Sequence, residues 1–457
     1  MENGDSRGAQ WVDVAAFIDA QPVGRFQIRV LLACAAVLFL DGYDTQAIGY
    51  VAPALGREWH LARGALGPVF SAGLFGLMLG ALILSPIADR IGRRRILLLS
   101  TVAFGLCALV TSFTSDVLSL LLIRFITGFG LGGAMPNAVA LTAEFSPQRR
   151  RATLVMAMFC GFSVGAALGG LLAAALIPAF GWQSVFVVGG IVPLLLAPVL
   201  ISLLPESPRL LALRRREDAR LAVLLARLAP GTRFAPGTRF GVREAPSAGV
   251  SVAHLFRERR TALTLLLWIV FFANLLDLYL LANWLPTVLN DLGISVSLAV
   301  AIGATFQIGG VIGAFALGQV IDRFASRALA AIYLLAAVSV AAIGLFAHSV
   351  VLATVAIACA GFCIVGGQTA SNALAATLYP TSVRATGVGW ALGIGRIGSI
   401  VGPAIGGVML ARQLAPGVLF AAAAVPALCA ALASVGLAGA TRRAGAVVGQ
   451  RDEHAAS

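Results

Sequence analysis

The chain has 457 residues, of which 59% are hydrophobic and only 12% are charged. This apolar content is enough for about twelve bilayer-spanning helices of about 20 residues each. A soluble globular enzyme, a disordered chain and a disulfide scaffold are excluded. The net charge is +13, and all 33 basic residues are arginines. Because these arginines lie between apolar segments, we interpret them as basic loops at one membrane face and not as a nucleic-acid surface.

The chain divides into five segments by charge and hydropathy. A polar segment, 1–26, precedes an apolar half, 27–205; an arginine-rich linker, 206–260, leads to a second apolar half, 261–438, and a tail, 439–457. We expect no cleaved signal peptide. The charge-free runs predict twelve helices, over residues 27–53, 65–87, 96–115, 117–143, 152–178, 184–204, 261–289, 297–320, 328–346, 350–376, 385–410 and 416–438.

The arginines also orient the predicted helices. With both termini in the cytoplasm, 28 arginines fall on the cytoplasmic side and three on the opposite side. Cytoplasmic loops of membrane proteins carry an excess of basic residues. The sequence therefore predicts an all-α polytopic membrane protein with twelve transmembrane helices and both termini in the cytoplasm.

Positions 233 residues apart match along the chain, in loops as well as in helices. The matched pairs include Asp44 with Asp277, Asp41 with Asn274, Asp89 with Asp322 and Arg90 with Arg323. Because six helices separate equivalent positions, the two halves have the same orientation and form a parallel repeat. Such repeats are typical of transporters whose substrate site lies near the midplane between the halves.

Several segments carry a resemblance to a known family. Residues 85–95 read SPIADRIGRRR, which resembles the loop signature of the major facilitator superfamily. Residues 40–45 (LDGYDT), 124–137 (RFITGFGLGGAMPN) and 379–387 (YPTSVRATG) are similar to segments of its aromatic acid:proton symporters, and most of all to importers of 4-hydroxybenzoate and protocatechuate. The resemblance covers nearly the whole chain outside 206–260 and the tails. It implies the major facilitator fold, with two six-helix halves, in an inner (cytoplasmic) membrane.

Two acids lie in the middle of the first predicted helix. Asp41 and Asp44 are three residues apart, so they share one helix face. Charges at this depth are costly unless they are paired or hydrated, and such acids can take up and release a proton. The alternative is a static buried ion pair with a neighbouring arginine. The resemblance implies that the matching acids are needed for transport. Asp277 has the equivalent depth in the second half, where it either couples protons or forms a hydrogen bond between helices.

Arg396 lies in the middle of the eleventh predicted helix and is the candidate for holding a substrate carboxylate, because its planar fork binds carboxylates bidentately. The alternative is a permanent pair with Asp277 or another acid. Asp41 and Asp44 are further substrate candidates, and Arg124 is a candidate for proton coupling. Polar side chains that either line the cavity or bridge helices are Asn274, Tyr279, Gln307, Gln368 and Asn372.

Charged residues at the cytoplasmic helix ends predict a gate. The first half supplies Asp89, Arg90, Arg93 and Glu144, and the second half supplies Asp322 and Arg323. Charge pairs among them would lock the cytoplasmic side and break when it opens. Charges that only set the topology would explain the arginines but not the acids.

These observations predict a proton-coupled secondary transporter that imports small aromatic carboxylates by alternating access. The alternative within the superfamily is a proton-coupled exporter of drugs or organic cations, although two intramembrane arginines favour anions. A non-transporting sensor would need a larger signalling domain than 206–260 or 439–457 provides. We see no catalytic set or metal-ligand spacing, and we expect a monomer without cofactor. Its partners would be the aromatic acid, protons and the lipid bilayer, and not nucleic acid.

Overall fold

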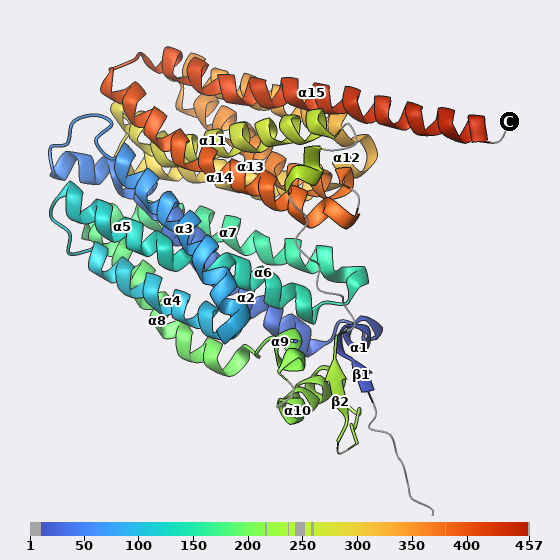
Figure 1. Cartoon of the computed structure of the whole chain (residues 1–457). Coiled ribbons are helices and arrows are strands. Elements are labelled where there is room, and N and C mark those ends of the chain that lie inside the picture. The colour runs from blue at the N-terminus through green and yellow to red at the C-terminus, as the bar shows by residue number, and fades with distance from the viewer. Residues whose placement is uncertain are drawn as a thin grey trace, which may run out of the picture.

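The computed structural model describes residues 11–214, 217–235, 237–242, 252–256, 260–379 and 381–455. Within α12–α15 it leaves the side chains of residues 318–319, 322–325, 376, 381–382, 384–385 and 441–455 outside the description. The described chain is almost entirely helical, and it contains twelve spans long and apolar enough to cross a membrane (Figure 1). The predicted fold class, an all-α membrane protein of twelve spans, is confirmed.

The first half is built from seven helices that make six spans. They are α2 (Arg25–Glu58), α3 (Gly67–Ile91), α4 (Arg93–Thr111), α5 (Val117–Gly132), α6 (Ala134–Phe145), α7 (Gln148–Phe180) and α8 (Gln183–Leu203). The fourth predicted helix is interrupted at Gly133, so that α5 and α6 together make one span.

The second half is built from five helices that make the other six spans. They are α11 (Thr261–Asp291), α12 (Val296–Leu345), α13 (Val350–Leu378), α14 (Thr381–Ala411) and α15 (Pro416–Ala455). The eighth and ninth predicted helices are one continuous element, α12, which holds the two spans Val296–Leu317 and Ser326–Leu345.

The third predicted helix, 96–115, extends too far at its end. In the structure the corresponding helix, α4, ends at Thr111. Ser112 and Thr114 donate hydroxyl hydrogen bonds back to the backbone, at 2.6 and 2.8 Å, and so favour a turn. Asp116 then begins α5 by accepting the backbone N–H groups of Leu118 and Ser119, both at 2.9 Å. Hydrogen bonds from the backbone and hydroxyl of Ser119 hold the pKa of Asp116 below its usual range.

Glycines let the helices of each half approach backbone to backbone. A Cβ atom at Gly165 in α7 would overlap the carbonyl oxygen of Phe39 in α2. The second half repeats this packing 233 residues later, since a Cβ at Gly398 in α14 would overlap the carbonyl oxygen of Phe272 in α11. Small residues at helix contacts are the usual device for close packing in membranes.

The linker and the chain start form a small structure of their own. Its elements are β1 (Trp11–Asp13), α1 (Val14–Ala20), α9 (Pro208–Leu213), α10 (Asp218–Leu228) and β2 (Arg239–Gly241). The 3₁₀ helix η1 (Val252–Phe256) packs instead on the second half, where Thr264 donates to the carbonyl of Leu255 at 3.0 Å. The strands pair in parallel, with Trp11 opposite Arg239. Val14, Leu225 and Phe240 join a buried cluster with residues of the first half. Figure 1 shows α1, α9, α10 and both strands at one end of that half, which we call the linker end.

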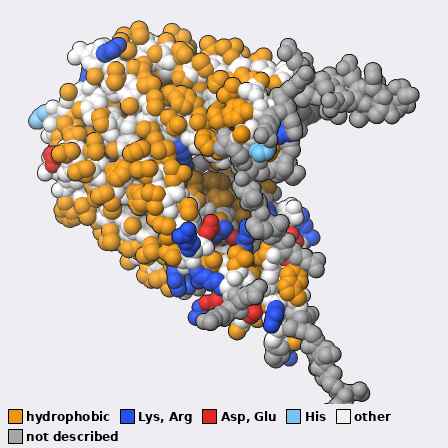
Figure 2. All heavy atoms as spheres, viewed as in Figure 1, with side chains coloured by type: hydrophobic (Ala, Val, Ile, Leu, Met, Phe, Trp, Pro, Cys, Tyr) orange, Lys and Arg blue, Asp and Glu red, His pale blue; other side chains and the backbone are white. Residues whose placement is uncertain are grey.

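The two halves contact each other at the opposite end of the bundle, which we call the far end. There, Ser71 in α3 donates to the carbonyl of Ile400 in α14 at 2.8 Å, and Ser297 in α12 donates to the carbonyl of Ala174 in α7 at 2.6 Å. Arg63 Nε lies 3.4 Å from Asp291 Oδ2. Figure 2 shows a hollow between the halves, with charged side chains gathered beside it. The structure is therefore closed at the far end and open toward the linker end.

Candidate functional site

A buried ion pair joins α2 to α5 inside the first half. Arg124 donates from Nη1 to Asp44 Oδ1 at 3.1 Å and from Nη2 to Asp44 Oδ2 at 3.0 Å. Nη2 also donates to the backbone oxygen of Asp44 at 3.2 Å, and both side chains are almost fully buried. This bidentate geometry is the strongest form of an arginine–carboxylate contact. In this conformation Arg124 is held by Asp44.

A small cavity adjoins this pair. Its volume is about 20 Å³, which is enough for one water molecule, and its lining includes Thr45, Arg124 and Asn283. The Nε atom of Arg124 is buried and has no hydrogen-bond partner within the described structure. Asn283 belongs to α11 of the second half. The cavity therefore reaches from the ion pair to the surface along which the two halves meet, which we call the seam.

Asp41 is fully buried on α2, as Asp44 is, but it does not contact Arg124. Its Oδ1 accepts the hydroxyl of Thr45 at 3.1 Å, and its Oδ2 has no partner in the described part of the chain. Arg396 of the second half lies close enough to interact with Asp41 electrostatically. The structure thus brings together an acid and an arginine that the sequence places 355 residues apart.

Arg396 reaches from α14 across the seam. Its Nη1 lies 3.5 Å from the Tyr279 hydroxyl, and its Nη2 lies 3.7 Å from the sulfur of Met135 in α6. Both contacts are long and weak. Among the described residues, no carboxylate lies within salt-bridge distance of Arg396. The permanent pair with Asp277, which the sequence left open, is not formed here.

Asp277 lies in the interior of the second half. Neither of its carboxylate oxygens has a hydrogen-bond partner in the described structure, and the Tyr333 hydroxyl and the backbone of Ala427 are near enough to interact with it electrostatically. The residue 233 positions after Arg124 is Ile357, which is fully buried. The repeat therefore reproduces the depth of Asp44 in Asp277 but not its arginine partner.

Polar side chains of α11 and α13 form a short chain. Asn274 Nδ2 donates to Gln368 Oε1 at 2.7 Å, and Gln368 Nε2 donates to Asn372 Oδ1 at 3.1 Å. The Oδ1 atom of Asn274 is buried and unpartnered within the described residues. Gln307 is buried in α12 and forms no hydrogen bond with these residues. Three of the predicted lining residues therefore act together, each with spare hydrogen-bonding capacity.

Charged residues of the predicted gate connect the first half to the linker. Arg93 donates to Asp89 Oδ1 at 3.3 Å and pairs with Glu144. Ser207 donates its hydroxyl to Glu144, and Arg214 donates to the backbone oxygen of Arg90. The described pairs stay within the first half and the linker. The side chains of Asp322 and Arg323, the second-half members of the predicted gate, lie outside the described residues.

The family profile of the Major Facilitator Superfamily matches residues 34–268 and, separately, residues 267–455. The chain belongs to the major facilitator superfamily. The two matches meet where the second half begins, in agreement with the 233-residue repeat. Twelve spans and membership of this superfamily make the chain a multi-pass membrane protein.

Relatives within the superfamily match over most of their length. The chain is 45% identical over 401 residues to the 4-hydroxybenzoate transporter PcaK of Pseudomonas aeruginosa, covering 87% of this chain and 90% of that protein. It is 44% identical over 427 residues to the gallate transporter of Pseudomonas putida, covering 92% and 94%. The xylose transporter XylE from E. coli, solved in a partially occluded inward open conformation, has a TM-score of 0.70. That match has 18% identity and covers 90% and 97% of the two chains, so it shows the superfamily fold alone.

One polar residue at the centre of this superfamily fold was missed from the sequence. Gln46 is buried in α2, and neither atom of its side-chain amide has a hydrogen-bond partner in the described structure. The sequence held a signal for it, because the residue 233 positions later is Tyr279, a predicted lining residue. A Gln and a Tyr at equivalent positions are not a match by residue type, so the repeat alone does not point to Gln46.

Proposed function

We propose that the chain is a proton-coupled secondary transporter that imports small aromatic carboxylates by alternating access. The supporting relatives are named for 4-hydroxybenzoate and gallate transport, and the identities are 45% and 44%. The observation that carries the proposal is Arg396, a guanidinium at the seam between the halves with no carboxylate partner among the described residues.

The carboxylate of the substrate would bind Arg396. This guanidinium already approaches Met135 and Asp41 of the first half, so a ligand held there contacts both halves. Asn274, Gln368, Asn372, Gln307 and Tyr279 would supply polar contacts to the rest of the ligand, and Asp41 and Asp44 would border the site. An alternating-access cycle moves the halves 27–205 and 261–438 about such a central site, with 206–260 as the linker.

The carriers of the protons would be Asp41 and Asp44, with Asp277 as a further site in the second half. A proton on Asp44 removes the charge that holds Arg124, so binding of the proton is linked to release of the bidentate pair. An anion imported against an inside-negative potential of about 100 mV is opposed by about 2.3 kcal/mol. One co-transported proton cancels this electrical cost, and a second makes import favourable.

The membrane would be the inner membrane of a bacterium, with the linker end in the cytoplasm. Support comes from the arginines, of which 28 lie on the side assigned to the cytoplasm and three on the opposite side. The hollow between the halves opens toward the linker end, so this conformation would face inward. We propose a monomer, in which each chain carries one complete site.

The gate residue Asp89 is expected to affect the rate of transport and not the binding of substrate. Its side chain is 65% exposed and contacts Arg93, which also pairs with Glu144. We expect Asp89→Asn to slow transport about tenfold or more while the Kd stays within about threefold. Exchange rates and equilibrium binding measured on the same purified protein check this. Glu58→Gln, at an exposed acid of the far end, is the control. A large loss of binding with normal turnover would contradict the gate.

The proposal as a whole is tested by comparing uptake with efflux in cells that express the chain. Labelled 4-hydroxybenzoate, gallate and benzoate should accumulate, and cationic dyes should not be expelled. Expulsion of dyes without accumulation of acids would instead support the exporter of organic cations, the alternative from the same superfamily.

A further inference from the structure

Gln46 has an unusual environment for a buried amide. The side chain is 1% exposed, and neither Oε1 nor Nε2 has a hydrogen-bond partner in the described structure. A buried amide without partners costs free energy, and nearly all buried polar groups in proteins are paired. The side chain therefore either pairs with a bound molecule or only destabilises the fold.

The helix face that carries Gln46 lies at the seam between the halves. Gly42, Gln46 and Gly49 are four and three residues apart, so they share one face of α2. A Cβ atom at Gly49 would lie 2.9 Å from the carbonyl oxygen of Ala282 and 3.0 Å from Cα of Asn283, both in α11. A Cβ at Gly42 would overlap the backbone of Phe162 in α7. Gln46 thus lies on the face of α2 whose glycines approach α7 and α11, one turn from Gly49 toward the linker end.

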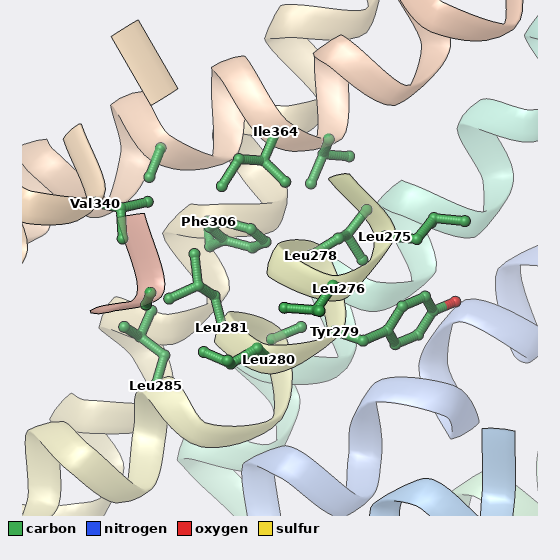
Figure 3. Close-up of a cluster of buried hydrophobic side chains, with 14 of the residues drawn as sticks. Leu275, Leu276, Leu278, Tyr279, Leu280, Leu281, Leu285, Phe306, Val340 and Ile364 are labelled. Atoms are coloured by element: carbon green, nitrogen blue, oxygen red, sulfur yellow. The ribbon is translucent and has the colours of Figure 1, made fainter. Parts of the chain in front are cut away.

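The equivalent residue of the second half lies beside the proposed carboxylate site. Tyr279 lies 233 residues after Gln46 and one turn before the same contact, on α11. Figure 3 shows Tyr279 pointing away from the leucine cluster around it, toward the ribbon of the first half. Its hydroxyl lies 3.5 Å from Nη1 of Arg396. Gln46 and Tyr279 therefore hold equivalent positions in the two halves, and Tyr279 adjoins the proposed carboxylate site.

We propose that Gln46 determines specificity by binding the ring hydroxyl of an aromatic acid whose carboxylate is held by Arg396. This inference rests on the proposed function. A phenolic hydroxyl both donates and accepts a hydrogen bond, and a primary amide does the same, so one ring hydroxyl can satisfy both amide atoms. An unsubstituted benzoate leaves the amide unpaired, which makes the site select against it.

The test uses the purified full chain and two ligands, 4-hydroxybenzoate and benzoate. Wild type should bind 4-hydroxybenzoate more tightly, and Gln46→Met should reduce the ratio of the two Kd values about tenfold or more. The change should come from weaker binding of 4-hydroxybenzoate, with the Kd of benzoate within about threefold. Gln46→Met also removes two unpaired buried polar atoms, so the ligand-free variant should unfold at the same temperature as wild type or higher.

A matched control lies one turn further along the same helix. Tyr50→Phe removes a buried hydroxyl that already donates to the carbonyl of Ala166 at 2.9 Å, so it should leave the ratio unchanged. An unchanged ratio in Gln46→Met would overturn the assignment of Gln46 while leaving the transport proposal in place. Lower stability of ligand-free Gln46→Met would also count against it, because it would show that the amide has a partner within the fold. Failure of wild type to bind either acid would overturn the proposed function, and this inference with it.

Discussion

Arg396→Lys is expected to weaken binding of aromatic carboxylates about 30- to 150-fold, although the substitution keeps the positive charge. Lysine is a point charge on a flexible stem and cannot supply the planar bidentate fork of arginine. The guanidinium has only two long contacts in this structure, to the Tyr279 hydroxyl at 3.5 Å and to the Met135 sulfur at 3.7 Å. Its hydrogen-bonding capacity therefore remains available for a substrate.

The measurement compares a benzoate-type acid with its neutral amide in binding to wild type and to Arg396→Lys. Wild type should prefer the acid strongly, and the variant should lose most of that preference. Arg412→Lys, at an exposed position beyond the end of α14, is the matched control and should behave as wild type. Full acid-over-amide discrimination in Arg396→Lys would make Arg396 a structural residue, and Arg124 would become the next candidate for the carboxylate.

Asp44→Asn is expected to abolish proton-driven accumulation of substrate. The substitution removes the titratable group and leaves Arg124 buried without its bidentate partner. Leaving one member of a buried pair alone costs about 3–5 kcal/mol, so the variant is expected to fold but to unfold at a lower temperature. Accumulation ratios against an imposed proton gradient, measured on protein shown to be folded in the membrane, check the coupling.

A double variant separates stability from coupling. Asp44→Asn combined with Arg124→Gln removes both charges, so it should recover most of the lost stability, because no unpaired charge remains. It should still fail to accumulate substrate, because the group that carries the proton is gone. Normal accumulation ratios in Asp44→Asn would refute its role in coupling. Recovery of accumulation in the double variant would show that the pair only supports the fold.

Helix positions followed from the sequence because the bilayer fixes the length of each apolar run. The errors lie where local hydrogen bonding decides the boundary, as at Thr111, where two hydroxyl groups end α4 four residues before the predicted end. The parallel pairing of β1 with β2 was not predicted. It pairs Trp11 with Arg239, which are separated in the sequence by the whole first half, and no local pattern encodes such a contact.

The candidate site was only partly predictable, because a repeat shows which residues have equivalent positions in the two halves but not which side chains they contact. The shift of 233 placed Asp277 at the depth of Asp44. Its environment differs because Ile357 occupies the position equivalent to Arg124. The proximity of Asp41 to Arg396 depends on how the halves meet, and this is absent from the sequence of either half. Gln46 was missed for a related reason, since the role of an amide in an apolar helix can be inferred only when its surroundings are known.

The central claim is that a proton gradient drives the import of an aromatic carboxylate, and purified wild-type protein in liposomes tests it most directly. With an acidic exterior and an alkaline interior, labelled 4-hydroxybenzoate should accumulate above its external concentration and leak out when a protonophore collapses the gradient. Uptake that only equilibrates, and that is the same with and without the gradient, would contradict the account.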